Sequence, residues 1–205
     1  MGLDNIPQEL RKLDQWVVWQ KGGKNAKRPY NARTGYPAKV DDPNTWSTYE
    51  EAAGAVENGK WGGVGFVFTE HDSFCFIDLD DVIDPKTGDI DKETHSAITR
   101  FDSYTEISQS GRGIHIIIKG EKPGDRSRSE RAEIYDRDRY AALTGDLWPE
   151  TPLTVEKRQA ELSDFYGETF VDGTTGDETE AVYIDASLDP DADVDGKLGI
   201  QSVAT

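Results

Sequence analysis

The sequence predicts an α/β (α+β) fold, in which short strands and a few helices alternate along one compact domain. Residues 74–80 alternate between apolar and other side chains in the manner of a half-buried strand. Residues 105–118 read as strand, glycine turn and strand, and residues 47–50 carry a helix-capping signal. The length of 205 residues suits one domain, or one domain with two lobes.

The N-terminal part is expected to contain two helices and a strand. Residues 7–13 form a short helix with Pro7 near its first turn, and residues 15–20 form a strand. Ser47 is the expected cap of a helix that runs to about Asn58, with Glu50 at the capping-box spacing.

Strands dominate the centre of the chain. Residues 63–69 and 74–80 are predicted strands, and the four residues between them favour an antiparallel hairpin. Helices are expected at residues 91–100 and 155–165. The remaining predicted strands are 105–108, 114–119, 132–135 and 140–144, with a charged connection at 121–131.

Asp78 and Asp80 are the first candidate site residues. On a strand, residues two apart share a face, so both carboxylates would point away from the face of Cys75, Ile77 and Leu79. Divalent Mg²⁺ or Mn²⁺ takes such hard oxygen ligands, and pairs of these ions serve polymerases and nucleases. The alternative is that the strand simply ends in a solvated acidic turn.

The glycine turn is the second candidate. Gly111 and Gly113 can adopt positive φ and direct backbone N–H groups outward, which suits an anion. A phosphate site would also draw on hydroxyl, guanidinium and imidazole groups close by, which are those of Ser108, Ser110, Arg112 and His115. A hairpin turn followed by a structural histidine is the alternative interpretation.

The third candidate lies in residues 131–136. Ala132 and Ile134 alternate with Glu133 and Tyr135, so this is a strand on which Glu133 is a plausible third metal ligand. An ordinary exposed strand residue is the alternative. Asp136 falls at the strand end and is the weaker choice, and Arg139 follows as a cation close by.

These three segments, in this order, resemble the motifs of the archaeo-eukaryotic primase superfamily. The resemblance is narrower to the primase–polymerase domain of phage, plasmid and proviral replication proteins, and it covers roughly residues 5–150. It implies a two-lobed fold with a mixed or antiparallel catalytic sheet, similar to an RNA-recognition fold and flanked by helices. The third motif is the shortest and weakest match.

The resemblance also implies roles. Asp78, Asp80 and Glu133 would hold two Mg²⁺ or Mn²⁺ ions and act in catalysis together with His115. The incoming nucleotide, NTP or dNTP, would be bound by Ser108, Ser110, Gly111, Arg112, Gly113, His115 and Arg139. Lys27 and Arg28 are secondary candidates for phosphates of the template.

The charge distribution qualifies this interpretation. The chain carries 40 acidic and 23 basic residues, a net charge of −17, whereas DNA-binding proteins are usually basic. Residues 21–40 hold six cations and no acid, which favours a local phosphate track in which Tyr30 and Tyr36 could stack bases of a single strand. A solvated loop is the alternative. The overall acidity is typical of a halophilic source.

We therefore expect residues 1–170 to form the catalytic domain and residues 171–205 an acidic, disordered tail. The expected function is a DNA primase, a DNA polymerase or both, acting on a single-stranded DNA template. A catalytically idle binding module and a metal-dependent nuclease are the rivals. A Walker A sequence is absent, so the chain is not itself a helicase: either a separate replicative helicase is a partner, or the chain is a stand-alone or truncated piece. Cys75 is the only cysteine, and without a long apolar run we expect a cytoplasmic protein with no membrane contact.

Overall fold

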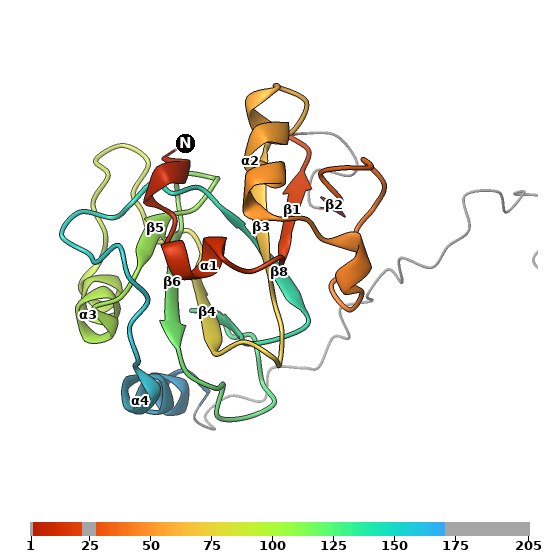
Figure 1. The fold of residues 1–205 in the computed structure, drawn as a ribbon. Helices are drawn as coiled ribbons and strands as arrows, with labels where there is room; N and C mark the ends of the chain where they lie inside the picture. The colour runs from red at the N-terminus through yellow and green to blue at the C-terminus, as the bar shows by residue number, and fades with distance from the viewer. Residues whose placement is uncertain (1, 22–27, 171–205) are drawn as a thin grey trace, which may run out of the picture. The chain divides into compact units, whose positions relative to one another are not determined.

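The computed structural model describes residues 2–21 and 28–170 (Figure 1). Two expectations lie outside the described residues: the template contact of Lys27 and the acidic tail at 171–205. No helix in the described part of the chain is long and apolar enough to cross a membrane.

Within these described residues the chain forms two four-stranded antiparallel sheets. In the first sheet the strand order is β2–β1–β3–β8. Its strands are β1 (Trp16–Trp19), β2 (Pro29–Tyr30), β3 (Gly63–Phe68) and β8 (Arg139–Leu143). The second sheet has the order β5–β6–β4–β7, also antiparallel throughout. Its strands are β4 (Phe74–Leu79), β5 (Thr105–Ile107), β6 (Ile114–Lys119) and β7 (Glu133–Tyr135).

Aromatic side chains fill the space between the two sheets. Phe66 and Phe68 of β3 meet Phe74 and Phe76 of β4, and the ring centroids of Phe68 and Phe76 are 5.4 Å apart. The same core receives residues from the short N-terminal elements η1 (Leu3–Asn5) and α1 (Gln8–Arg11), of which Leu10 is fully buried. Packing of this kind fixes the two sheets against each other.

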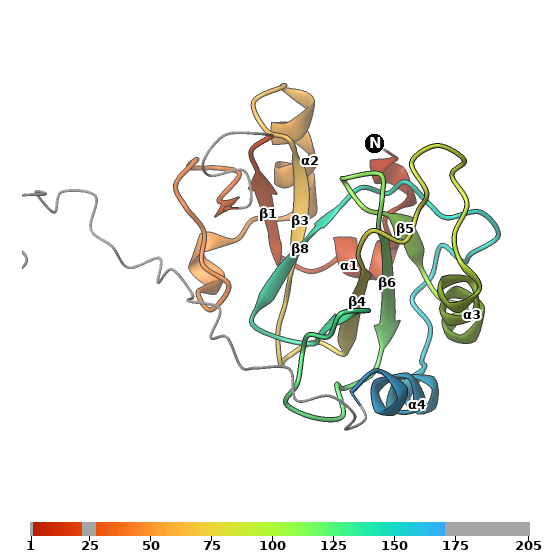
Figure 2. The ribbon, with the colours of Figure 1, turned by 180° about the vertical axis from the view of Figure 1, so that it is seen from behind.

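Two helices cover the other face of the second sheet. Helix α3 (Lys92–Phe101) and helix α4 (Gln159–Phe170) lie side by side on that face (Figures 1 and 2). Ile77 and Ile116 point toward them, whereas Phe76 and Ile117 point into the core between the sheets. The expected fold class, antiparallel sheets flanked by helices, is therefore confirmed, as is the facing of the β4 side chains.

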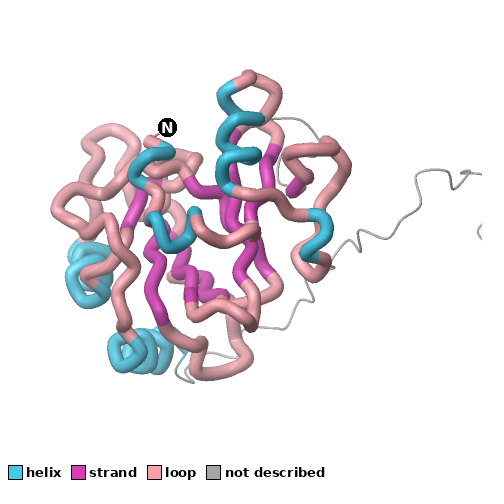
Figure 3. The backbone as a smooth tube through the Cα atoms, viewed as in Figure 1, coloured by secondary structure: helices cyan, strands magenta, loops and turns pink. Residues whose placement is uncertain are grey.

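Helix α2 (Tyr49–Glu57) packs on β1 and β3 after the short turn η2 (Pro43–Thr45), as Figure 3 shows. Its capping box is formed by Thr48 and Glu51. The expected pair, Ser47 and Glu50, was wrong by one residue, because the Ser47 hydroxyl instead accepts from the Ala32 amide at 3.1 Å.

Two other expectations were wrong. Strands β3 and β4 belong to different sheets and do not form a hairpin, because each has an aromatic face that is buried only when the strands lie across the core from each other. The last helix begins at Gln159 rather than near 155. The residues before it run beside the end of β6, where the Lys119 amide donates to the Glu156 carbonyl at 2.8 Å.

Candidate active site

Four titratable side chains form one row across the second sheet. Asp78 pairs with Glu133 on one side and with His115 on the other, and His115 pairs with Glu106 of β5. Side chains that are directly opposite on antiparallel strands lie about 4.5–5.5 Å apart at Cβ. The row faces the first sheet, because the adjacent residues on that face, Phe76 among them, lie in the core between the sheets.

A cleft of about 460 Å³ opens between the end of this row and strand β8. It is lined by Phe76, Asp78, Asp80, Ser108, Gln109, Ser110, His115, Arg128, Glu133, Arg139, Tyr140, Ala141 and Ala142. All three sequence segments that were singled out thus contribute side chains to one cavity.

Asp78 lies at the bottom of the cleft with 18% of its side chain exposed. Its Oδ1 is buried and accepts no hydrogen bond, and the His115 Nε2 is 3.6 Å away. Burial raises the pKa of Asp78 to about 6, helped by the charges of Asp80 and Glu133 and opposed by those of His115 and Arg139. A buried carboxylate oxygen without a hydrogen bond is uncommon in a folded protein, and a catalytic role or a bound cation is among its explanations.

His115 is buried between two carboxylates. Its Nδ1 is 3.1 Å from Oε1 of Glu106, and its Nε2 faces Asp78. Burial alone lowers the pKa of His115, but the hydrogen bond to Glu106 and the charges of Glu106, Asp78 and Asp80 outweigh it, so the pKa is raised above its ordinary value.

Glu133 is held by three donors at the edge of the cleft. Arg128 and Arg139 each approach a different carboxylate oxygen at 3.3 Å, and the Tyr135 hydroxyl donates at 2.9 Å. The Arg139 guanidinium also lies 4.7 Å from the Tyr135 ring centroid. Two cations therefore stand beside the third acidic residue. Asp136 is not in the cleft lining, and its carboxylate accepts from the Lys122 amide.

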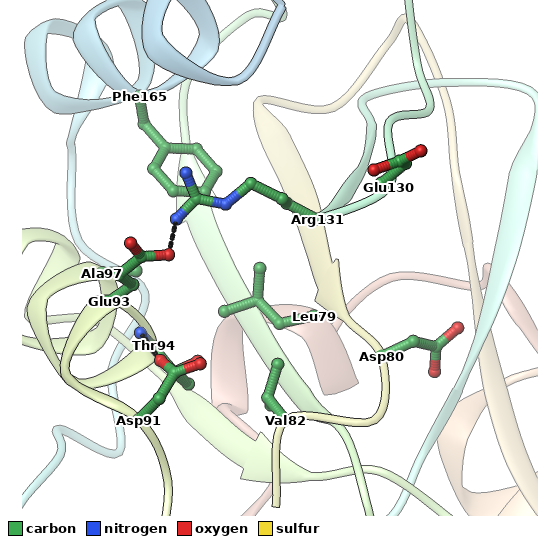
Figure 4. Close-up of a pocket in the computed structure, with 10 residues that line it drawn as sticks. All are labelled: Leu79, Asp80, Val82, Asp91, Glu93, Thr94, Ala97, Glu130, Arg131 and Phe165. Atoms are coloured by element: carbon green, nitrogen blue, oxygen red, sulfur yellow. Dashed lines mark hydrogen bonds and ion pairs between the residues drawn. The ribbon is translucent and has the colours of Figure 1, made fainter. Parts of the chain in front are cut away.

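Asp80 follows the end of β4 and lines two cavities. The second, of about 220 Å³, lies beside α3, and the ion-paired Arg131 and Glu93 are among the residues that line it. Figure 4 shows the Asp80 carboxylate directed away from that ion pair and from Leu79. Asp80 therefore stands on the boundary between the two cavities, in reach of the larger one.

The turn after β5 presents serine hydroxyls to the cleft. Ser108 and Ser110 lie 2.9 Å apart at their hydroxyl oxygens, and both line the cavity. The expectation that the glycine amides point outward was wrong: Gly111 donates to the Ser108 carbonyl and Gly113 to the Ser108 hydroxyl. Gly113 has another role, because a Cβ there would lie 2.9 Å from the Leu79 carbonyl oxygen, so only glycine lets the turn approach β4 this closely.

The remaining cations and aromatic residues divide between the cleft and the outside. Arg112 is not in the cleft lining and pairs with Asp81 at 3.0 Å, whereas Arg139 lines the cavity. Tyr30 is only 8% exposed and packs against Trp61, so its ring is not presented to a base as we expected. Tyr36 is 74% exposed, and Arg28 is half-buried.

The carboxylates fit a divalent cation that also binds substrate. In the described part of the chain, no three His, Cys, Asp or Glu side chains make a ready metal cage. Mg²⁺ rarely needs one, since it is usually held by one or two carboxylates together with substrate phosphates and water. The unsatisfied Oδ1 of Asp78 and the exposed carboxylate of Asp80 meet that requirement, whereas Glu133 is already paired.

Sequence reasoning missed Glu106. Its side chain is completely buried and completes the row behind His115. The signal was available, because Glu106 is an acidic residue between Thr105 and Ile107 in a strand expected to be buried, and such a charge is retained only when it is paired. Its partner could not be identified without the register of β5 against β6.

No family model matches the sequence. The chain is 36% identical, over 146 residues, to a protein of Nitratiruptor phage NrS-1 named DNA Primase-polymerase. The match covers 68% of this chain and 20% of the phage protein, so the chain corresponds to about a fifth of that relative. Taken with the antiparallel sheets, this relationship shows that the chain carries a domain of the primase–polymerase family.

Proposed function

We propose that the chain is a template-directed nucleotidyltransferase, a DNA primase, a DNA polymerase or both, that joins nucleotides on single-stranded DNA. The observation that carries the proposal is the row of Glu133, Asp78 and His115, which opens into a cleft beside Asp80 and two serine hydroxyls. The relationship to a phage protein named DNA Primase-polymerase supports it.

In this proposal Asp78 and Asp80 hold divalent Mg²⁺ or Mn²⁺, two ions in all, and Glu133 joins them once Arg128 or Arg139 has turned away. Such ions lower the pKa of an attacking hydroxyl and neutralise charge on the phosphates. The protein itself contributes by holding the carboxylates close together before the substrate binds. The buried position of Asp78 supports this role.

The other side chains of the cleft act on the triphosphate. The hydroxyls of Ser108 and Ser110 donate to phosphate oxygens, and His115 lines the same cleft. Arg128 and Arg139 exchange Glu133 for phosphate, because guanidinium groups bind both anions with the same bidentate geometry. A separate helicase that supplies the single strand, a cytoplasmic location and a halophilic source stay predictions.

The test is incorporation of labelled NTP or dNTP with Mg²⁺ or Mn²⁺ on single-stranded DNA, with and without a primer. Asp78→Asn/Asp80→Asn is compared with Asp84→Asn/Asp89→Asn, which also removes two charges, from exposed residues outside the cleft. We expect products from the parent and the control, and a loss of about 10³-fold or more in the cleft variant.

Four outcomes separate the alternatives. Products in the primed lane alone would identify a polymerase, and products in both lanes a primase. Shortened DNA without nucleotide consumption would identify a nuclease. Absence of any product, with unchanged binding of single strands in both variants, would contradict catalysis and favour a binding module.

A further inference from the structure

Tyr36 is the most exposed large apolar residue in the part of the chain that the structure describes. It is 74% accessible, and Leu153, at 53%, is the other large apolar residue that is mostly exposed there. Single exposed rings are common on protein surfaces. The Tyr36 ring differs from a chance exposure in two respects: its backbone is fixed, and a lysine without an acidic partner lies beside it.

The turn that carries Tyr36 is held by the buried side chain of Asn31. The Oδ1 atom accepts from the Arg33 and Thr34 amides, each at 2.9 Å, and the Nδ2 atom donates to the Thr45 carbonyl at 2.9 Å. The Asn31 amide also donates to the Tyr36 carbonyl at 2.9 Å. The backbone below the exposed ring is therefore ordered before any ligand binds, so a ligand that contacts the ring does not have to order it.

The Lys60 ammonium lies against the same turn. A Cβ on Gly35, which precedes Tyr36, would lie 3.2 Å from the Lys60 Nζ. The same Nζ is 5.0 Å from the centroid of the Trp61 ring, which packs in turn against Tyr30. Lys60 is exposed and forms no ion pair with any residue that the structure describes. Its charge is therefore available to an anion without the loss of a carboxylate partner.

The charges around the turn favour a negatively charged ligand. Residues 28–40 contain three cations and no acid, in a chain whose net charge is −17. The Arg33 guanidinium contacts the Trp46 carbonyl at 2.8 Å and the Glu51 carboxylate at 3.6 Å. Single-stranded nucleic acid fits both features of this surface, because it binds proteins through phosphate contacts and through stacking of its bases on aromatic rings. A duplex offers the phosphates but no free base faces.

We propose that Tyr36 and Lys60 form a docking surface for single-stranded DNA, in which the Tyr36 ring stacks on a base and the Lys60 ammonium contacts a neighbouring phosphate. The inference rests on the proposed function for the identity of the strand, the template. Strand β2, which leads into the turn, and β8, which lines the cleft, are the two edges of the first sheet and are separated by three strand spacings of about 4.8 Å. A template that reaches the cleft is therefore held at a second place, more than one nucleotide away.

The first measurement compares two labelled strands of about eight nucleotides, oligothymidylate and a strand of the same length without bases, on the protein with a chelator at low salt. We expect Tyr36→Ala to raise the Kd of oligothymidylate about tenfold and that of the abasic strand less than about twofold, because stacking needs a base. Tyr36→Phe should keep both Kd values within about twofold of the parent, as should Leu153→Ala, which removes the other exposed side chain. Equal losses on the two strands, or none on either, would overturn the proposal.

The second measurement is the slope of log K against log[KCl] for both strands. Lys60→Gln should make the slope shallower by about 0.7, which is the contribution of one phosphate of a single strand. Lys86→Gln is the matched control and should leave the slope unchanged, because Lys86 is also exposed but lies in the turn before α3. An unchanged slope in Lys60→Gln would show that this ammonium contacts no phosphate, and would overturn the proposal.

Strand binding and nucleotide incorporation test the two proposals separately. The same loss on Tyr36→Ala is expected in the Asp78→Asn/Asp80→Asn variant, because Tyr36 is not among the residues that line the cleft. A parent that incorporates no nucleotide but shows the Tyr36-dependent binding would contradict the proposed function alone. A parent that incorporates nucleotide, while Tyr36→Ala binds both strands as the parent does, would contradict the docking surface alone.

Discussion

At the scale of single residues, the ionised carboxylate of Asp78 lowers the free energy of unfolding. Its pKa is raised to about 6, chiefly by burial, whereas the unfolded value is near 3.8, so the folded state disfavours the ionised form. The free energy of unfolding therefore falls as the pH rises from about 4 to about 6, and the full cost is present above that range. A group that lowers stability in this way is more often kept for function than for folding.

We predict that Asp78→Asn stabilises the metal-free protein at pH 8 by on the order of 1–3 kcal/mol, because the amide has the same shape without the charge. Urea unfolding of both proteins with a chelator measures the difference, which should shrink toward zero below about pH 4. Adding Mn²⁺ should stabilise the parent and leave the variant unchanged. A variant that is less stable than the parent at pH 8 would contradict this account.

The residue scale also shows what the sequence could predict. The period of two along β4 and β7 correctly placed Asp78 and Glu133 on the face of each strand opposite to its neighbours Ile77 and Ile134, which are buried against the helices. That the two strands pair, with the two carboxylates directly opposite each other, could not be read from that period. The burial of Tyr30 could not be predicted from its basic surroundings. Its ring is covered by Trp61, which lies 31 positions further along the chain, in a contact created by the pairing of β1 with β2 and β3.

At the scale of elements, the sequence predicts that helices and strands exist better than it predicts their partners. The predicted hairpin of residues 63–80 was wrong because a four-residue connection can either form a turn within one sheet or lead from one sheet to another. Here Asp72 directs the passage: its carboxylate accepts from the Thr69 amide at 3.0 Å, the Phe74 amide at 2.9 Å and the Gln15 side chain at 2.8 Å. Only the last of these bonds reaches beyond residues 69–74, to Gln15 immediately before β1.

The capping of helix α2 gives a prediction at this scale. Glu51 accepts from the Thr48 amide at 3.0 Å, whereas the adjacent Glu50 is exposed and closes no box. Glu51→Ala should therefore lower the free energy of unfolding by about 0.5–1 kcal/mol, and Glu50→Ala by much less. The exposed pair of Glu51 with Arg33, at 3.6 Å, adds little. Chemical denaturation of the two variants measures both changes in the free energy of unfolding. Equal decreases would show that negative charge near the helix N-terminus, and not the capping box, stabilises the helix.

At the scale of the whole molecule, a net charge of −17 must coexist with the proposed site for nucleotide and DNA phosphates. The described structure resolves this by pairing: most arginines near the cleft and around it already face a carboxylate. Ion pairs at 4 Å or less join Arg33–Glu51, Arg100–Glu168, Arg112–Asp81, Arg128–Glu133, Arg131–Glu93, Arg137–Asp136, Arg139–Glu133 and Arg158–Asp102. Each of these guanidinium groups must give up its carboxylate partner before it binds a phosphate. The net Coulombic energy of each phosphate contact is therefore smaller than it would be for an unpaired arginine.

We therefore predict that binding of single-stranded DNA depends weakly on salt. Each phosphate that is neutralised on a single strand contributes about −0.7 to the slope of log K against log[KCl], so two net contacts give about −1.4. Fluorescence anisotropy of one labelled oligonucleotide from low to molar KCl measures the slope, and an uncharged-backbone strand of the same sequence gives the part due to base stacking. A slope of about −4 or steeper would contradict the prediction, because it would require about six cations to release their carboxylates at once. With a shallow slope, affinity would rest on stacking and on cations shared between Asp78, Asp80 and the substrate, and activity would persist at molar salt.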